Sequence, residues 1–464
     1  MKRVYKYIAY GVMAVLVLLM MAATIVERLY GSPVALRWFY HNPLFIGLWA
    51  VVAVSGMEYL VRLGTYKRVF TMGIHVSLVI ILAGALVTHL FGESGEIHPR
   101  EGEPAASFTL DDDSQASLPF SVRLESFAID YYPETTRPSD YRSVITFFPE
   151  GAVAEISMNH IAKYKGYRLY QADFDEDGKG SILAVSHDPW GVGITYAGYL
   201  LLLLSMIGFF FQKDTSFREA LSALRRKEPR NRSTIPVAVG TFAALALWVF
   251  LTVVIVRRWI ASGTGPFVGQ YNVMLLMAWF STLAVLLLIR RFPPVAIPGF
   301  LLTGLVLFMA FRSQGGREMM PLMPVLRSPL LSIHVFSIIL SYTLFGLVAI
   351  NGIVGVTARK RETRIQLKDW SLSILYPAVC LLTFGTFLGA VWANNSWGNY
   401  WAWDPKETWA LVTMLVYSFA LHGKVLKPFR HSRSFHWFTI IAFFCVIVTY
   451  FGVNLILGGI HSYS

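Results

Sequence analysis

Long apolar stretches, separated by short polar segments, run through most of this 464-residue chain. A transmembrane helix needs roughly 20 consecutive, mostly apolar residues. Eleven segments fit this pattern, at 8–26, 43–61, 70–91, 192–211, 235–256, 270–289, 293–311, 330–357, 371–392, 409–424 and 437–457. The pattern predicts a polytopic α-helical membrane protein with about 11 transmembrane helices. The segment at 293–311 is the least clearly bounded, because RRFPPVAIP leaves little room for a turn before it.

A long polar region interrupts the apolar pattern after the third predicted span. It contains runs such as YRSVITFF and SILAVSHD, in which apolar and polar residues alternate between turns rich in Pro, Gly and Asp. This alternation is typical of half-buried strands, so we predict one small β-rich domain outside the membrane. The predicted divisions are three helices in 1–91, the β-rich domain in 92–190, a fourth helix in 191–211, a basic cytoplasmic linker in 212–233 and a second membrane domain in 234–464.

The composition supports membrane insertion and decides how the charge is interpreted. Charged residues make up 15% of the chain, whereas soluble proteins carry about 25%. The net charge of +12 would suggest nucleic acid binding in a soluble protein. With a cytoplasmic N-terminus, however, about 24 Lys and Arg fall in inner segments and about eight in the short outer loops, as the positive-inside rule requires. We therefore predict that orientation and no nucleic acid partner.

The N-terminal apolar run and the cysteines restrict the possibilities further. No small-residue cleavage signal follows the first run, so we expect it to be a retained anchor. Cys380 and Cys445 are the two cysteines, and each lies within an apolar run. The chain contains no CxxC or CxxCH. It therefore has neither a disulfide framework nor its own attachment site for c-type haem.

Tryptophan is concentrated in one segment, WGNYWAWDPKETWAL, which begins at Trp397. Five of the chain's 13 tryptophans lie between Trp392 and Trp409. A membrane-interface belt would spread aromatic rings over many helix ends, whereas clustered flat faces suit a flat, largely apolar ligand. DPKE also has a structural interpretation, since Asp404 suits the N-cap and Glu407 the N3 position of a capping box.

Histidines inside predicted spans are candidates for function because burying a polar ring in lipid is costly. His75 and His422 lie on oppositely directed spans at about the same depth near the cytoplasmic side, while His334 and His461 both fall at the outer face, level with the tryptophans. Haem is a flat ligand whose iron takes axial imidazoles, so the two pairs fit haem. Four unrelated helix-end histidines remain an alternative. Weaker candidates are His89 and His41, and polar segments contain His98, His160, His187, His431 and His436.

These residues resemble a known family. WGNYWAWDPKETWAL is similar to the signature of the WWD-domain haem-handling proteins, and LLSIHV and GVNLILGGIHSYS resemble the flanking segments of its CcsA/ResC branch. SHDPWGVGITYAGYLLLLL and the first three spans are similar to CcsB/ResB. The chain thus resembles a fused CcsBA-type, system II cytochrome c synthase. The resemblance is closest over 320–464, and the outer domain is short for the family.

The resemblance implies export of haem b across the bacterial inner membrane and its covalent attachment, through thioether bonds, to the CxxCH segment of apocytochrome c. His75 and His422 match the family's transmembrane haem ligands, and His334 and His461 match the outer ligands, which are the expected catalytic residues. The loop at 392–409 matches the haem-binding segment. Its expected haem-binding residues are Trp392, Trp397, Tyr400, Trp401, Trp403 and Trp409. A separate thiol reductant protein is implied as a partner.

Some interpretations stay open. Lys406, Arg317 and Arg327 are candidates to pair with the haem propionates, although cationic side chains at helix ends also snorkel to the interface. A membrane b-type cytochrome would share the histidines but give the tryptophan loop no task. A haem transporter would pass its cargo to a separate lyase. In an assembly scaffold, the tryptophans would form a protein interface.

Overall fold

The computed structural model describes residues 2–110, 113–226, 234–263, 265–267, 269–290, 292–313 and 323–458. The long helices are α1 (Lys2–Tyr30), α3 (Pro43–Leu63), α4 (Val69–Phe91), α5 (Gly191–Phe211), α7 (Thr234–Ser262), α8 (Gln270–Leu288), α9 (Ala296–Arg312), α10 (Pro329–Thr357), α11 (Arg361–Ser396), α12 (Pro405–Leu421) and α13 (Ser432–Ile447) with its π-helical extension η6 (Val448–Leu457). Short helical segments are α2 (Ser32–Ala35), η1 (Leu36–Tyr40), η2 (Thr65–Lys67), α6 (Ser216–Arg226), η3 (Pro293–Val295), η4 (Pro324–Leu326) and η5 (Lys427–Arg430).

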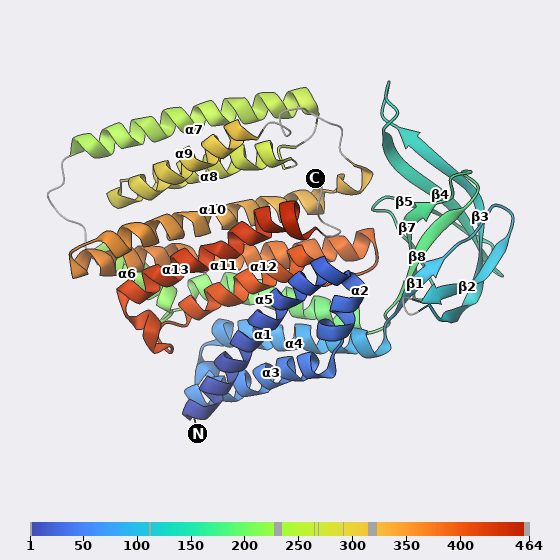
Figure 1. The fold of residues 1–464 in the computed structure, drawn as a ribbon, viewed down its shortest axis with the longest axis horizontal. Helices are drawn as coiled ribbons and strands as arrows, with labels where there is room; N and C mark the ends of the chain where they lie inside the picture. The colour runs from blue at the N-terminus through green and yellow to red at the C-terminus, as the bar shows by residue number, and fades with distance from the viewer. Residues whose placement is uncertain are drawn as a thin grey trace.

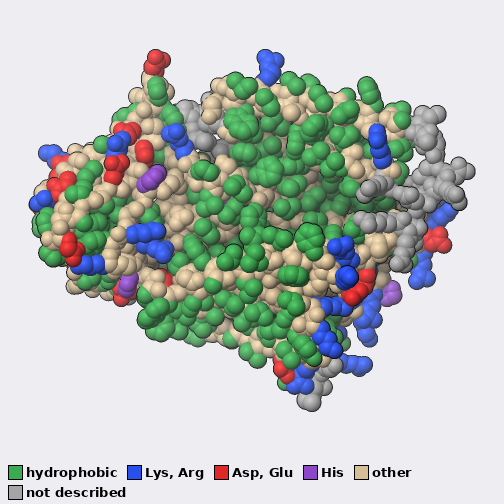
Figure 2. Space-filling view, turned by 180° about the vertical axis from the view of Figure 1, so that it is seen from behind, with side chains coloured by type: hydrophobic (Ala, Val, Ile, Leu, Met, Phe, Trp, Pro, Cys, Tyr) green, Lys and Arg blue, Asp and Glu red, His purple; other side chains and the backbone are tan. Residues whose placement is uncertain are grey.

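The long helices run in a common direction and form one bundle, and the β-strands gather beyond one end of it (Figure 1). α7, α8 and α9 pack along one side, α10, α11 and α13 pack together in the middle, and α1, α3, α4 and α5 lie on the other side. Apolar side chains cover much of the bundle surface, while Lys and Arg gather at the end opposite the β-strands (Figure 2). An apolar lateral surface between charged ends is what a membrane-spanning bundle requires.

The predicted polytopic helical membrane protein with one small β-rich domain is confirmed. Among the described residues, ten helices are long and apolar enough to cross a membrane, against about 11 predicted spans. The difference is the span predicted at 409–424, which corresponds to α12. This helix has only 17 residues, or about 25 Å, less than the hydrocarbon thickness of roughly 30 Å. It is packed among α1, α11 and α13, so neighbouring helices shield it from lipid.

The predicted linker at 212–233 contains a helix of its own. α6 packs against α11, and Glu219 in α6 forms an ion pair with Lys424, 2.5 Å away, in the turn after α12. α11 also begins at Arg361, ten residues before the predicted span at 371–392, and therefore extends toward α6. The linker is thus attached to the end of the bundle that lies far from the β-strands.

The β-domain is a single antiparallel sheet of eight strands in the order β5-β4-β3-β2-β1-β8-β7-β6. The strands are β1 (Glu93–Ile97), β2 (Pro104–Leu110), β3 (Gln115–Tyr131), β4 (Pro138–Phe148), β5 (Ala152–Ser157), β6 (Ala162–Tyr164), β7 (Tyr167–Phe174) and β8 (Ser181–His187). The sheet curls so that β5 also contacts β6 and β7. Its interior is mostly apolar, and Val122, Leu124, Ile145, Leu169 and Leu183 are fully buried at its centre. Because β1 follows α4 and β8 precedes α5, the domain is fixed to the bundle at both ends.

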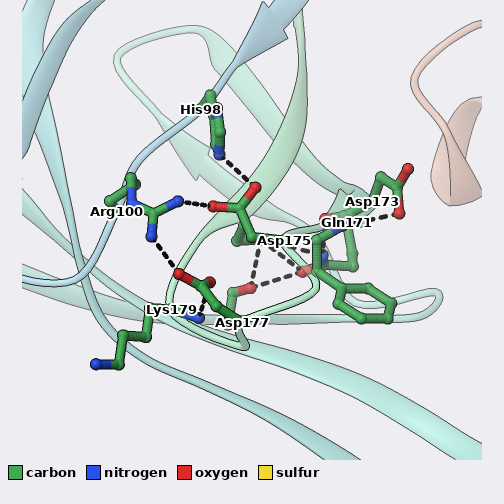
Figure 3. A network of polar contacts seen from close by, with 10 residues as sticks. His98, Arg100, Gln171, Asp173, Asp175, Asp177 and Lys179 are labelled. Atoms are coloured by element: carbon green, nitrogen blue, oxygen red, sulfur yellow. Dashed lines mark hydrogen bonds and ion pairs between the residues drawn. The ribbon is translucent and has the colours of Figure 1, made fainter.

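The β7–β8 turn is tied to the segment after β1 by a polar network (Figure 3). Asp175 accepts hydrogen bonds from Arg100 and from His98 Nε2, the latter at 2.9 Å. Arg100 also reaches Asp177 at 2.5 Å. The backbone N–H of Lys179, followed by the Arg100 guanidinium, lowers the pKa of the Asp177 carboxyl. The network thus orients the turn.

Candidate functional site

The tryptophan loop connects α11 to α12 at the β-domain end of the bundle. Asp404 caps α12 as predicted, since its Oδ1 accepts the Lys406 N–H at 2.8 Å. Glu407 does not complete the usual capping box, because its Oε2 accepts the N–H of Ala402, at 2.9 Å, rather than that of the N-cap residue. Trp403 has a φ of 59°, a conformation that is uncommon for a bulky residue. The loop is thus held in a specific, strained shape.

The five tryptophans divide into separate groups. Trp403 stacks on Tyr40 with ring centres 4.4 Å apart, and Trp401 meets Trp403 edge to face at 5.8 Å. Trp392 and Trp397 pair with each other at 4.8 Å. Trp409 is buried beneath α1, where its Nε1 donates to Thr24 at 3.1 Å. The predicted aromatic set therefore does not form one continuous face.

The N-terminal half of the chain holds the loop in place. The Tyr400 hydroxyl donates to Thr88 Oγ1 of α4 at 3.0 Å, and Thr88 in turn donates to Asp188 at 2.5 Å. Tyr400 is buried, and burial raises the pKa of its phenol. Gly398 has a φ of +83°, and a Cβ there would lie 2.7 Å from the Tyr170 ring of the β-domain. The loop therefore depends on contacts with α4 and with β7.

A second contact joins the β-domain to the C-terminal half. Asn159, in the turn after β5, accepts from Trp392 Nε1 at 3.2 Å and from the Ser396 hydroxyl at 3.0 Å. Its amide donates to the Val325 carbonyl in η4 at 3.2 Å. One side chain thus bonds the end of α11 and the segment before α10. Sequence reasoning missed Asn159, because its partners are more than 160 positions away and no local pattern marks it.

A cavity of about 1440 Å³ extends along the bundle between the two halves of the chain. It exceeds the roughly 300–1,000 Å³ of ordinary small-molecule pockets. α3, α4, α5, α11 and α12 supply its walls, which are mostly apolar. Its lining includes His75 and His422 at the end far from the β-domain and Tyr400, Trp401 and Trp403 at the β-domain end. Trp392, Trp397 and Trp409 are not among the described residues that line it.

The inner histidine pair, His75 and His422, faces this cavity with ring centres 6.1 Å apart. His75 Nδ1 lies 2.8 Å from the Thr71 carbonyl, and His422 Nδ1 lies 2.7 Å from the Ser418 carbonyl. A carbonyl only accepts, so each Nδ1 carries the proton and each Nε2 keeps a lone pair. Two imidazoles on opposite sides of one metal, each at about 2.0 Å, have ring centres about 6 Å apart. The pair fits a haem iron in spacing and tautomer.

His334 lies on the opposite side of α11 from the cavity. Its Nδ1 is 2.6 Å from the Gly385 carbonyl, so this nitrogen carries the proton and Nε2 keeps the lone pair. Thr383 and Phe387 of α11 line the cavity, whereas Gly385 and Gly389 face α10, where Gly389 lies against the His334 ring. His334 itself is not among the described residues that line the cavity. Its predicted partner His461 lies outside the described residues.

The three cationic residues predicted as candidates to pair with the haem propionates differ in their surroundings. Lys406 Nζ donates to Asn454 Oδ1 in η6 at 2.8 Å. Arg327 is exposed, and its guanidinium lies 5.8 Å from the centre of the Tyr132 ring of the β-domain. Arg317 lies outside the described residues. Three cations that the sequence reasoning did not single out, Lys67, Arg68 and Lys424, line the cavity at the end where the inner pair lies.

Fold and site define a polytopic helical membrane protein with a β-domain at one end of its bundle and several histidines along one cavity between the helices. Residues 267–461 match the family model "Cytochrome C assembly protein", and residues 60–188 match the ResB-like family. The chain is 31% identical over 275 residues to the cytochrome c biogenesis protein CcsA of a Synechococcus strain, covering 51% of this chain and 87% of that protein. It is 29% identical over 321 residues to CcsA of Prochlorococcus marinus, covering 60% and 96%.

Protein NrfI of Wolinella succinogenes is 35% identical over 227 residues, which are 47% of this chain but only 25% of NrfI. The chain thus spans about a quarter of this relative's length and nearly all of the CcsA relatives. It belongs to the cytochrome c assembly protein family and combines that segment with a ResB-like one. Family membership assigns the chain a role in cytochrome c biogenesis.

Proposed function

We propose that this protein is a fused CcsBA-type cytochrome c synthase, which moves haem b across the bacterial inner membrane and attaches it to the CxxCH segment of apocytochrome c. One observation carries the proposal: the inner histidine pair faces a single cavity that extends to Trp401 and Trp403. The orientation is the one that the positive-inside rule requires, with the N-terminus in the cytoplasm and the β-domain outside.

In this proposal, haem is received by the inner pair. His75 and His422 bind the iron through Nε2, because their Nδ1 protons are held by the Thr71 and Ser418 carbonyls. Lys67, Arg68 and Lys424 surround this end of the cavity and balance the two propionates. The apolar walls exclude water from the macrocycle. Loading requires Lys424 to exchange its ion pair with Glu219 for a propionate.

At the outer side, Trp401 and Trp403 pack against the macrocycle while it lies in the cavity, and His334 and His461 ligate the iron once it has passed beyond α11. His334 is oriented through its Nδ1 contact with Gly385. Trp392, Trp397, Tyr400 and Trp409 serve this site as the WWD segment, with Trp409 acting through its buried position beneath α1. The proposed propionate partners on this side are Arg327, Arg317 and Lys406. Lys406 must give up its hydrogen bond to Asn454 before its ammonium group can pair with a propionate.

Attachment itself depends mainly on positioning. Each thiol of CxxCH adds across one haem vinyl group, so that sulfur bonds to carbon and the thiol proton goes to the other vinyl carbon. This addition needs neither oxidant nor strong base, but both groups must be held in reacting geometry. The thiols must arrive reduced. Cys380 and Cys445 lie within α11 and α13, so a separate thiol reductant is the proposed partner.

The test is co-expression of the chain with a CxxCH apocytochrome in cells that lack their own maturation system, with a thiol reductant supplied. Denaturing gels are then stained for haem on the apocytochrome band. We expect covalent haem with the native chain, loss of it with His334→Ala, and at least a tenfold loss with His75→Ala or His422→Ala. His431→Ala, an exposed residue before α13, is the matched control and should retain full attachment.

Three outcomes contradict parts of this proposal. A coloured membrane protein without covalent product would indicate a transporter or an electron-transfer cytochrome. A colourless protein would remove haem from the proposal. Normal attachment by the His334→Ala chain would exclude His334 as an outer ligand.

A further inference from the structure

The structure brings together two histidines outside the four predicted ligands. The rings of His41 and His89 have centres 5.3 Å apart at an angle of 48°. His41 is the C-cap of η1, and His89 lies in the last turn of α4. Both rings line the same cavity as the inner pair. His41 and His89 are called the β-side pair below.

The β-side pair and the inner pair lie at opposite ends of one helix face. His75 and His89 are 14 residues apart on α4 (89 − 75), which is nearly four turns or about 21 Å. Residues separated by close to a whole number of turns share a face. α4 therefore presents one histidine to the cavity near each end, and a second element supplies its partner at each end, namely His422 after α12 and His41 after η1.

The tryptophan loop is attached to the immediate neighbours of both histidines. Tyr40, which precedes His41, stacks on Trp403 at 4.4 Å. Thr88, which precedes His89, accepts the hydrogen bond from Tyr400. The aromatic loop and the β-side pair thus form one wall of the cavity mouth. His334, by contrast, faces away from this cavity across α11.

We propose that His41 and His89 are a third pair of axial ligands, beside the inner pair and the proposed outer pair His334 and His461, and that they hold an iron porphyrin at the β-domain end of the cavity after the inner pair has released it. This inference rests on the proposed function. The ring centres must part by about 1 Å to hold an iron at ordinary imidazole distances. The exchange replaces two imidazole ligands with two others and leaves charge and oxidation state unchanged. Trp401 and Trp403 then lie where they can cover the macrocycle.

The test uses the full chain in detergent, with haemin as the probe. His75→Ala, His422→Ala, His334→Ala and His461→Ala are combined in one variant. We expect this variant to bind haemin with the absorption spectrum of a low-spin, bis-imidazole complex. Adding His41→Ala and His89→Ala should weaken haemin binding at least tenfold and give a high-spin spectrum. Adding His431→Ala instead should change neither the haemin affinity nor the low-spin spectrum.

A rescue experiment with free imidazole distinguishes the loss of an iron ligand from misfolding of the protein. It should restore the low-spin spectrum when His41 and His89 are replaced by glycine. A second variant, His89→Cys in a chain that also carries His75→Ala and His422→Ala but is otherwise native, covers the case in which the multiple variant does not fold. A thiolate ligand should then shift the absorption of the reduced carbon monoxide complex to a longer wavelength.

The proposal is overturned if His41→Ala and His89→Ala leave haemin affinity and spin state unchanged, or if His89→Cys gives no thiolate spectrum. These results would not affect the proposed synthase as long as the native chain still attaches haem. A native chain that neither binds nor attaches haem would instead overturn the proposed function itself.

Discussion

The inner histidine pair and the tryptophan loop are positioned in opposite ways. His75 and His422 are each oriented by a carbonyl four residues earlier in the chain, on Thr71 and Ser418. The loop is oriented by residues far away in sequence, such as Thr88 and Tyr40. Each inner ring is therefore oriented within its own helix, although the pairing brings α4 and α12 together from the two halves of the chain. The orientation of the loop itself requires the N-terminal half, the β-domain and the C-terminal half to be docked.

This difference has a functional consequence. A local arrangement persists when the domains shift, since a helix carries both the imidazole and its acceptor. An arrangement built from remote contacts depends on the position of every partner, and the β-domain is one of them through Tyr170 and Asn159. In the proposed synthase, haem is thus received at a fixed site and delivered at one that the outer domain and its apocytochrome partner can adjust. Perturbing the outer contacts should impair delivery while leaving the inner pair intact.

The largest effect on this comparison is expected from Gly389→Ala. A Cβ at residue 389 would lie 2.6 Å from His334 Nδ1, so the imidazole must move away from the Gly385 carbonyl. Overpacking of this kind costs about 1–3 kcal/mol. We expect at least a tenfold loss of covalent attachment, with haem still bound at the inner pair. Haem-stained gels measure covalent attachment, and the absorption spectrum of the purified protein measures haem bound at the inner pair.

Gly304→Ala is the matched control for this substitution. Gly304 lies in α9, and a Cβ at this residue would have nothing within 4 Å, so attachment should stay at the native level. Equal loss in both variants would show that helix glycines matter for assembly and not for His334. Loss of inner haem in the Gly389→Ala protein would contradict the separation of the two regions.

A smaller effect is expected from Asn159→Ala. This change removes the hydrogen bonds to Trp392, Ser396 and Val325 and leaves buried polar atoms without that partner. Each such loss costs about 1–3 kcal/mol. We expect a lower thermal midpoint for the β-domain and reduced attachment, while haem at the inner pair is unchanged. His160→Ala, the exposed neighbour, is the control. An unaltered midpoint in the Asn159 variant would argue that the docking does not depend on this side chain.

The same contrast explains what could be predicted from the sequence. Apolar runs indicate the helices because lipid imposes a simple length requirement, and α12 departs from it because protein surrounds this helix. The matching depth of His75 and His422 follows from counting residues along two antiparallel spans, and their rings do lie together. Local sequence is sufficient because each ring depends on its own helix.

The outer region is less predictable because its partners are remote. His334 is oriented by Gly385, 51 residues away, and Trp403 stacks on Tyr40 from the opposite half of the chain. The five tryptophans are close in sequence yet separate in space, since their ring partners lie on different elements. The positions of His41 and His89 along the chain do not show that their rings meet, because the contact joins the end of η1 to the last turn of α4, 48 residues further along.

The smallest expected effect comes from Tyr400→Phe. It removes one hydrogen bond, to Thr88, worth about 0.5–1.5 kcal/mol at neutral pH.

Burial raises the pKa of the Tyr400 phenol, so the folded state holds the proton more tightly than the unfolded state. The resulting stability is complete below the ordinary tyrosine pKa of about 10 and is lost as pH rises through the raised value. The phenylalanine variant has no such loss. The stability gap between the two proteins should therefore narrow above about pH 10, as measured by thermal unfolding of the purified proteins. Tyr131→Phe, at an exposed position in β3, is the control and should leave the thermal midpoint at neutral pH unchanged. A gap for Tyr400→Phe that widens as pH rises would contradict the assigned direction.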